Sequence, residues 1–384
     1  MEYKKLGELC DVVSGGTPSR SKQEYWNGDI PWIKIGNIKS KYVSEADEFI
    51  TEAGLSGSSA KMLKKGTILY TIFATLGEAG VLTIDACTNQ AIAGITIKDE
   101  FVIYRDYLFY YLKSKKNYVN EVGRGVAQNN INMSILRGFE VPIRKLHEQQ
   151  EITNILDKTS SIIEGRRQEL DKLDELIKAR FVEMFENGSD ENTYRLEEIA
   201  DIVSGITKGR KTKETEFREV PYMAVSNVKD GYIDWTTVKT ILATEDEIRQ
   251  YKLMPNDVLM TEGGDPDKLG RGAIISNPPE DCIHQNHIFR VRLDEKRVLP
   301  RYFSAYLQSP QAKKYFLKAA KQTTGIASIN MTQLRGLPTI IPTIDSQREY
   351  AEFCKQVDKS KVVVQKALNE TQTLFDSLMQ EYFG

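Results

Sequence analysis

The chain has 384 residues, a length that favours two or three domains. With 40% hydrophobic residues, 28% charged residues and a formal net charge of −2, it is typical of a soluble globular protein and does not by itself indicate a polyanionic partner. The sequence has neither an apolar run of about 18 residues nor an apolar region behind Met1. We therefore expect no membrane span, no secretory signal and a cytoplasmic location.

Residues 1–146 are predicted to form a mixed α/β domain. The runs Gly66–Phe73 and Ala91–Ile97 are rich in β-branched and apolar residues and are bounded by glycine or aspartate, so we expect strands there. The aromatic stretch Tyr107–Lys113 is expected to form a short helix.

Residues 147–187 are predicted to form one long helix, which begins after Pro142. Alternating steps of four and three residues give it the seam of a coiled coil, although polar positions weaken that seam. Gly165 in the middle either permits a close approach of another helix or is only a weak point. The expected seam consists of Ile152, Leu156, Thr159, Ile163, Arg166, Leu170, Leu173, Ile177, Arg180 and Met184.

Residues 188–344 repeat the first domain, with an offset that grows from 190 to 198 through small insertions. A duplicated chain can place two similar surfaces about a pseudo-twofold axis, which suits the approximate twofold symmetry of duplex DNA. The clearest matches are Leu6–Gly15 with Leu196–Gly205 and Leu63–Thr71 with Leu253–Thr261 (offset 190), Cys87–Gln90 with Cys282–Gln285 (offset 195), and Ile131–Met133 with Ile329–Met331 (offset 198).

Residues 345–384 are predicted to form a second long helix after Pro342. The fold class is therefore α+β: two duplicated mixed α/β domains separated by two long helices, which form an antiparallel coiled coil with pseudo-twofold symmetry. The second seam is expected to consist of Tyr350, Phe353, Val357, Ser360, Val364, Ala367, Thr371, Leu374 and Leu378.

Catalytic and metal-binding motifs are incomplete in this sequence. Ser276–Pro279 contains the Asn-Pro-Pro of adenine methyltransferases, but Glu280 follows where an aromatic ring would stack on the flipped base, so we expect a turn between strands. Cys282, His284 and His287 are one ligand short of a usual metal site. The sequence has no P-loop, and its four cysteines are expected to be reduced and buried.

The sequence resembles the specificity subunits of type I restriction–modification systems. Gly15–Ile35 is similar to the opening of their target-recognition domain, Ser58–Thr67 to its middle and Thr88–Ala91 to a late strand. Thr261–Gly272 and His284–His287 resemble another variant of the same domain. The resemblance covers nearly the whole chain, and the order of the motifs, the duplication and the two helices together make it specific.

The resemblance implies a non-catalytic subunit with two target-recognition domains, 1–146 and 188–344, that each read one half of a split DNA sequence. The helices 147–187 and 345–384 would be the spacer that holds these domains apart. Two methylase subunits would dock on the chain and methylate adenine N6, and motor-nuclease (restriction) subunits would join them. S-adenosylmethionine, ATP and magnesium would be bound by those partner subunits, and no membrane is involved.

Physical reasoning selects the residues that would contact double-stranded DNA. Base edges are read by Arg, Lys, Asn and Gln, and phosphates are bound by cations, hydroxyls and backbone N–H groups on glycine-containing loops. For each loop the alternative is a solvated turn, for the amides a structural hydrogen bond, and Trp26, Trp32 and Tyr222 are expected in the core. The candidates are Ser14, Gly15, Gly16, Thr17, Ser19, Arg20, Lys22, Gln90, Arg124, Gln128, Thr207, Lys208, Arg210, Lys211, Lys213, His284, Gln285, Asn286, Gln322 and Thr323.

Two other functions compete with this interpretation. The first is a scaffold or adaptor that uses its coiled coil for protein docking and binds no DNA. The second is a fused restriction enzyme, which the missing catalytic motifs argue against.

Overall fold

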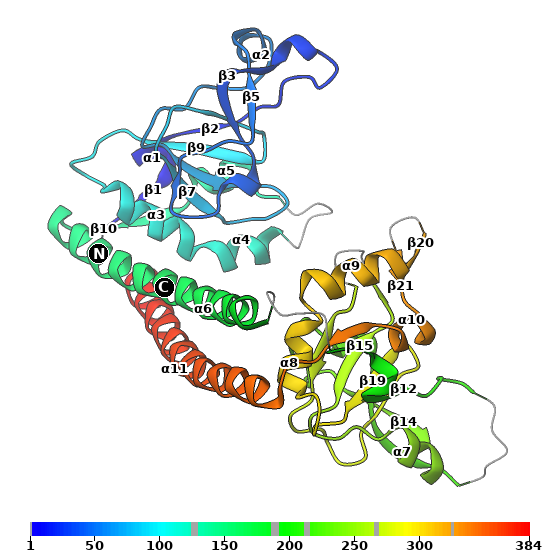
Figure 1. The fold of residues 1–384 in the computed structure, drawn as a ribbon. Helices are drawn as coiled ribbons and strands as arrows, with labels where there is room; N and C mark the ends of the chain where they lie inside the picture. The colour runs from blue at the N-terminus through cyan, green and yellow to red at the C-terminus, as the bar shows by residue number, and fades with distance from the viewer. Residues whose placement is uncertain (1, 124–129, 186–191, 211–215, 265–268, 324–325) are drawn as a thin grey trace. The chain divides into compact units, whose positions relative to one another are not determined.

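The computed structural model describes residues 2–123, 130–185, 192–210, 216–264, 269–323 and 326–384 (Figure 1). The chain forms two compact units: residues 1–168 with 365–384, and residues 169–364. Each unit contains one β-rich domain, part of the helix that follows that domain, and part of the other long helix. The predicted fold class of duplicated mixed α/β domains with two long helices is confirmed.

The domain of the first unit is built on a five-stranded sheet of order β2-β9-β6-β7-β4, a three-stranded sheet of order β5-β3-β8 and a pair β1-β10. Its helices are α1 (Leu6–Leu9), α2 (Glu52–Ser56), α3 (Arg105–Ser114), α4 (Lys116–Gly123) and α5 (Met133–Arg137). Its strands are β1 (Glu2–Lys5), β2 (Cys10–Ser14), β3 (Trp26–Ile33), β4 (Tyr42–Val43), β5 (Glu48–Ile50), β6 (Ile68–Thr71), β7 (Ala79–Leu82), β8 (Cys87–Thr88), β9 (Ile92–Ile97) and β10 (Glu140–Ile143).

The domain of the second unit repeats these sheets as β12-β19-β15-β17, β14-β13-β18 and β11-β22, and adds a small sheet β16-β21-β20. Its helices are α7 (Glu245–Tyr251), α8 (Pro300–Tyr306), α9 (Pro310–Ala319) and α10 (Met331–Arg335). Its strands are β11 (Thr193–Arg195), β12 (Ala200–Ser204), β13 (Arg218–Met223), β14 (Lys239–Ala243), β15 (Val258–Thr261), β16 (Gly263–Gly264), β17 (Gly272–Ile274), β18 (Ile283–His284), β19 (Ile288–Leu293), β20 (Lys321–Thr323), β21 (Ile326–Ser328) and β22 (Pro338–Ile340).

The strands and short helices expected from the sequence are present. Strands β6 and β9 occupy the two predicted runs, and all four residues of β6 are buried, as a continuous apolar run predicts for a central strand. The stretch Tyr107–Lys113 lies in α3. Ser276–Pro279 lies between strands β17 and β18, so the prediction of a turn is confirmed. All four cysteines are free and buried, as expected.

A buried glutamine joins each domain to the helix that follows it. In the first unit, Gln149 is fully buried, accepts a hydrogen bond from the backbone N–H of Tyr104 at 2.8 Å and donates to the carbonyls of Val102 and Arg144. In the second unit, Gln347 is equally buried and makes the equivalent three bonds to Leu299, Arg297 and Pro342. The same buried amide therefore fixes the start of each long helix.

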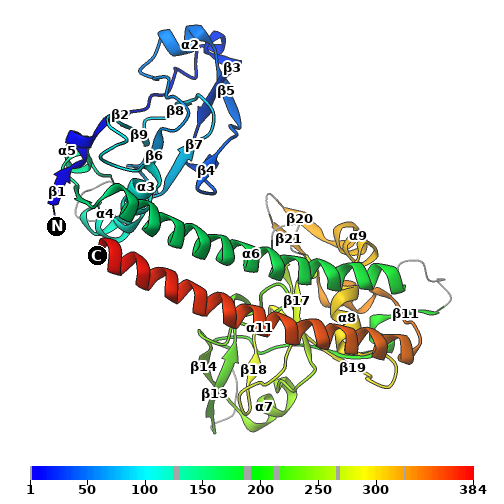
Figure 2. The same ribbon diagram turned by 90° about the vertical axis from the view of Figure 1, so that its left-hand side faces the viewer.

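The two long helices are α6 (Leu146–Phe185) and α11 (Ile344–Phe383), and a segment of one lies beside a segment of the other within each unit (Figure 2). Their direction is clear in the second unit, where Lys361 pairs with Asp174 at 2.6 Å and Glu349 pairs with Arg180 at 2.6 Å. Residue numbers rise along one helix while they fall along the other, so the predicted antiparallel packing is confirmed.

The seam predicted for α6 is confirmed, because all ten of its positions are buried or half-buried. The seam predicted for α11 is wrong in part: Ser360 is exposed and Leu374 is 54% exposed, whereas Cys354 and Phe375 are buried. Phe375 packs edge-on against Tyr110 of α3, with ring centroids 6.2 Å apart, so packing against the domain and not the heptad repeat sets the helix rotation there. Within the described residues, no atom outside the backbone of its own helix lies within 4 Å of the position that a Cβ on Gly165 would take, so this glycine does not serve a close helix approach.

The C-terminal end of each long helix carries aromatic rings into a domain core. Phe383 of α11 contacts Tyr107 in the first unit, with centroids 5.1 Å apart. Phe185 of α6 contacts Tyr302 in the second unit, with centroids 4.9 Å apart. Within the described residues, no helix is long and apolar enough to cross a membrane.

Candidate nucleic-acid interface

In the first domain, three chain segments that are far apart in sequence converge where the strands of the large sheet end. The loop that follows β2 passes so close to the turn after β8 that a Cβ on Gly15 would lie 2.2 Å from the carbonyl oxygen of Asn89. The backbone N–H of Gly16 donates to Thr88 O at 2.9 Å, and Thr17 donates its hydroxyl to Gln90 Oε1. Only glycine permits this approach, so the loop predicted to bind DNA is held against the predicted amide.

The third segment is the end of strand β6. The N–H of Ile72 donates to Ala91 O at 2.9 Å, and the next residue, Phe73, forms an antiparallel bridge with Asn130. The candidate residues Arg124 and Gln128 lie outside the described residues, and the chain re-enters the described structure at Asn130. We call the residues 14–22, 72–74, 88–91 and 130 the first loop cluster.

The second domain repeats the backbone bonds of this convergence. A Cβ on Gly205 would lie 2.0 Å from His284 O, and the N–H of Ile206 donates to that oxygen at 2.8 Å. The N–H of Glu262 donates to His287 O at 3.0 Å, and Gly263 pairs with Ser328. We call the residues 204–210, 262–263, 284–287 and 328 the second loop cluster.

The strand pairing corrects the repeat register at the turn after β8. The offset of 195 predicted from Cys87 and Cys282 pairs Gln90 with Gln285. In the structure, β8 and β18 occupy equivalent places beside β3 and β13 at an offset of 196, which pairs Gln90 with Asn286. The matching cysteines were misleading because a buried apolar position accepts cysteine, alanine or isoleucine equally well.

The structure places the candidate residues in different environments. Ser19, Arg20, Lys22, Gln90, Thr207 and Lys208 are exposed, while Ser14, Gly15, Thr17, Gln285 and Asn286 are half-buried and Gly16 is buried. Lys22 donates to Tyr25 Oη at 2.8 Å, and Ser204 donates to the backbone carbonyl of Asn286 at 2.6 Å. Lys211 and Lys213 lie outside the described residues, and for Gln322 and Thr323 only the backbone strand β20 is described.

Two candidates are corrected by their surroundings. His284 is fully buried, with Nδ1 3.0 Å from Tyr251 O and Nε2 3.3 Å from Val203 O, so its side chain does not reach a ligand. Burial lowers the pKa of His284 to about 4, against a weaker opposing effect of these two carbonyls. Arg210 is only 20% exposed, and its Nε and Nη2 atoms both donate to Glu247, so this pair of guanidinium donors already has a partner.

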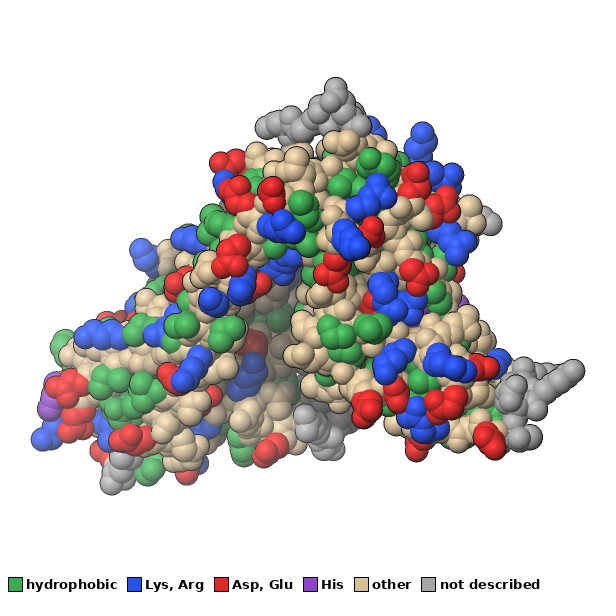
Figure 3. Space-filling model, turned by 60° about the horizontal axis from the view of Figure 1, so that its bottom comes forward, with side chains coloured by type: hydrophobic (Ala, Val, Ile, Leu, Met, Phe, Trp, Pro, Cys, Tyr) green, Lys and Arg blue, Asp and Glu red, His purple; other side chains and the backbone are tan. Residues whose placement is uncertain are grey.

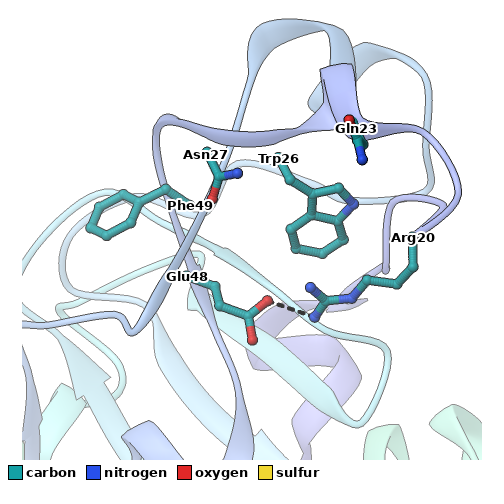
Figure 4. Close-up of a pocket in the computed structure, with 6 residues that line it drawn as sticks. All are labelled: Arg20, Gln23, Trp26, Asn27, Glu48 and Phe49. Atoms are coloured by element: carbon teal, nitrogen blue, oxygen red, sulfur yellow. Dashed lines mark ion pairs between the residues drawn. The ribbon is translucent and has the colours of Figure 1, made fainter.

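The first domain also has a cleft that sequence reasoning missed (Figure 4). Arg20 stacks on Trp26, with its Cζ atom 3.7 Å from the ring centroid, and pairs with Glu48 at 2.6 Å. Lys34 pairs with the other carboxylate oxygen of Glu48, also at 2.6 Å. The hydrogen bond from Lys34 and the charge of Arg20 keep the pKa of Glu48 below its usual value. The cleft could not be predicted from a sequence motif, because Arg20 and Glu48 are 28 positions apart.

The prediction that the aromatic residues lie in the core is confirmed for Trp32 and Tyr222 but not for Trp26. Trp32 is 3% and Tyr222 6% exposed, whereas Trp26 is only half-buried at the cleft. Trp26 and Trp32 donate their indole N–H groups to the carbonyls of Ser19 and Gly16, so both rings also fix the loop. Among the residues that the structure describes, no group of three His, Cys, Asp or Glu side chains is arranged to hold a metal ion.

The charge of the surface is mixed. On the face drawn in Figure 3, Lys and Arg side chains are interspersed with Asp and Glu side chains. This pattern on the drawn face agrees with the formal net charge of −2.

Two copies of one α/β domain, each with its own loop cluster and each followed by a 40-residue helix, define a duplicated two-domain protein with two long helices. The family model for the type I restriction modification DNA specificity domain matches residues 1–174 and 188–371. The chain belongs to this family of specificity subunits, which recognise DNA targets for type I restriction systems.

Relatives with curated names agree with this assignment. The chain is 24% identical over 404 residues to the type I restriction enzyme MjaIX specificity subunit of Methanocaldococcus jannaschii, with 98% of this chain and 91% of the relative covered. It is 20% identical to the EcoKI specificity subunit of Escherichia coli K12, over 91% of this chain and 80% of that one.

Two solved structures share the fold. The type I restriction–modification S subunit from M. genitalium has a TM-score of 0.54 at 16% identity, covering 100% of this chain and 96% of that one. A chain from a structural study of complex assembly and conformational transition of the type I system has a TM-score of 0.62 at 15% identity, covering 100% and 97%.

Proposed function

We propose that this chain reads a bipartite DNA sequence, one half with each loop cluster, and docks the subunits that carry out the chemistry. The observation that carries the proposal is the repeated convergence: the same backbone bonds build both clusters, while exposed side chains such as Arg20 and Gln90 in the first and Lys208 and His287 in the second differ. Equivalent frames with different side chains are what two independent readers of two half-sites require.

The partners we propose are two methylase subunits and, for restriction, motor-nuclease subunits. The structural study of assembly concerns a protein of the same fold, and the specificity names of the relatives imply partners of this kind. We propose that S-adenosylmethionine, ATP and magnesium are bound by these partners and that this chain is not itself catalytic, in keeping with its incomplete Asn-Pro-Pro motif.

The experiment measures methyl transfer from labelled S-adenosylmethionine to DNA by the chain alone, by the methylase alone and by both. Activity only in the mixture, at one bipartite motif mapped by N6-methyladenine sequencing, supports the proposal. Activity of the chain alone contradicts it.

A salt titration of DNA binding separates this function from a docking scaffold that binds no DNA. Contacts to phosphates release counterions, so the affinity for duplex DNA should fall steeply with salt concentration. Replacing residues 1–146 with the equivalent domain of a relative should change one half of the methylated motif and preserve the other.

A further inference from the structure

We propose that Arg20 is the guanine-reading side chain of the first domain, and that Trp26, Glu48 and Lys34 are the residues that position it. This inference rests on the proposed function, because it assigns one base of the half-site that the first domain reads. The ligand is the major-groove edge of a guanine in a G·C pair.

The orientation of Arg20 is fixed before any ligand arrives. The Cζ atom of its guanidinium lies over the indole of Trp26, 3.7 Å from the ring centroid, and 5.3 Å from the ring centroid of Trp32. Glu48 holds the Nη2 atom at 2.6 Å. A planar group that is stacked on one face and anchored at one nitrogen can offer only its remaining edge, so less rotamer entropy is lost on binding.

The charge of Arg20 is preserved although it is paired. Glu48 accepts a hydrogen bond from Lys34 on Oε1 and forms an ion pair with Arg20 through Oε2, so one negative charge faces two positive charges and the trio keeps a net charge of +1. The guanidinium has five N–H donors, and Glu48 is its only polar partner among the described residues. Donors therefore remain for a ligand, and the Arg20 side chain is 57% exposed.

The backbone around the cleft is shaped to present this group. Strand β3 has a bulge at which Trp26 and Ile30 both oppose Ile50 of β5, and Asn27 has a left-handed φ of 60°. Bulges and strained non-glycine residues re-aim side chains at functional sites. The resulting cleft has a volume of about 520 Å³ and is lined by Arg20, Gln23, Trp26, Asn27, Glu48 and Phe49 (Figure 4).

Guanine is the base that fits this donor set. It presents two acceptors, O6 and N7, to the major groove, and an arginine that points an edge at them forms two parallel hydrogen bonds. Adenine, cytosine and thymine each present a donor or a single acceptor there, so none of them satisfies the fork. Among the described residues of the equivalent loop in the second domain, Arg210 does not offer the same donor set, because Glu247 occupies two of its nitrogens.

The first test maps the methylated motif in cells that express the partner methylase with each variant of this chain. We expect wild type to show a fixed guanine in one half-site, and Arg20→Ala and Arg20→Lys to accept any base at that single position, because lysine keeps the charge but cannot form the fork. Glu48→Gln should weaken the preference for guanine at the same position. Lys64→Ala, which removes an exposed cation of the same domain outside the loop cluster, should leave the motif unchanged.

The second test measures binding of the chain to a duplex in which that guanine is replaced by 7-deazaguanine, which lacks the N7 acceptor. Wild type should bind this duplex about 5- to 150-fold more weakly than the natural one, which is the range for a specific base contact. Arg20→Ala should bind both duplexes equally.

These results separate the inference from the function on which it rests. If wild type yields no bipartite motif, the proposed function fails. If the motif appears but Arg20→Ala keeps every fixed base, or weakens binding to all sequences equally while Arg20→Lys restores it, Arg20 is a phosphate contact or a structural residue and the inference is overturned. Equal melting temperatures of the variants and wild type check that folding is intact.

Discussion

The two glycines at the start of the loop clusters provide the sharpest test of the proposed reading frame. In Gly15→Ala, the new Cβ would lie 2.2 Å from Asn89 O, at least 1.2 Å closer than the 3.4 Å at which ordinary contact begins. In Gly205→Ala the Cβ would lie 2.0 Å from His284 O. The obstacle is backbone in both cases, so the loop itself must move by more than 1 Å and the bond between Gly16 N and Thr88 O, 2.9 Å long, is lost or strained.

A shift of this size misaligns the base contacts of one half-site. The loss of one contact, at about 1–3 kcal/mol, predicts a rise of roughly 5- to 150-fold in the Kd for the full DNA site, and a second lost contact raises it further. The assay is fluorescence anisotropy with duplexes in which one half-site at a time is scrambled.

Each glycine variant should become insensitive to scrambling of one half-site, a different half for each, while remaining sensitive to the other. Gly36→Ala is the matched control, because no atom lies within 4 Å of its Cβ position. Wild-type affinity for Gly15→Ala, or loss of both half-sites with an unchanged melting temperature, would refute the reasoning.

The remaining predictions concern the frame that carries the clusters. Gln149→Leu leaves one N–H and two carbonyls unpaired in a buried site, so it should lower the free energy of unfolding in urea by about 3–5 kcal/mol. Gln347→Leu should lower it by a similar amount. The two effects should add because the residues lie in different units. Phe375→Ala should destabilise the chain by about 3–5 kcal/mol and Leu374→Ala by less than about 1 kcal/mol in thermal melts, a contrast that a strict heptad seam would reverse. Burial lowers the pKa of His284 from 6.5 to about 4, so between these values the unfolded chain binds a proton that the folded chain does not. The free energy of unfolding should therefore fall by up to about 3 kcal/mol as the pH is lowered through this window, and His284→Asn should remove that part of the slope measured for wild type.

The long elements were predictable because their signals are local. The seam of α6 follows from residues three and four apart, and the buried strands β6 and β9 follow from runs of β-branched residues. The rotation of α11 was not predictable in the same way. Phe375 is buried because Tyr110 lies opposite it, and a contact between residues 265 positions apart leaves no trace in a heptad pattern.

The loop clusters were predictable as a set of segments but not as a geometry. Glycine with hydroxyls and cations marked residues 14–22 and 207–213, of which 211–213 lie outside the described residues. The structure brings the first loop to Gln90 and brings Ile206, just before the second loop, to Asn286. Whether a cationic side chain is free to contact DNA depends on partners that are distant in the sequence. Glu247 occupies Arg210, while Glu48 only anchors Arg20 because Lys34 shares its charge, and none of these pairings follows from spacing in the sequence.

The repeated bonds explain how one fold can serve two different half-sites. The bonds that build each cluster run between backbone groups, such as Gly16 N to Thr88 O and Ile206 N to His284 O, and the close approach that permits them requires glycine at equivalent positions, Gly15 and Gly205. Side chains at the tips take little part in these backbone bonds. The first domain has Gln90 where the second has Asn286, and this difference alters the surface offered to DNA without altering the frame. Stability is supplied elsewhere, by the buried glutamines and the aromatic ends of the helices. Recognition can therefore change residue by residue at the tips while the free energy of folding stays nearly constant.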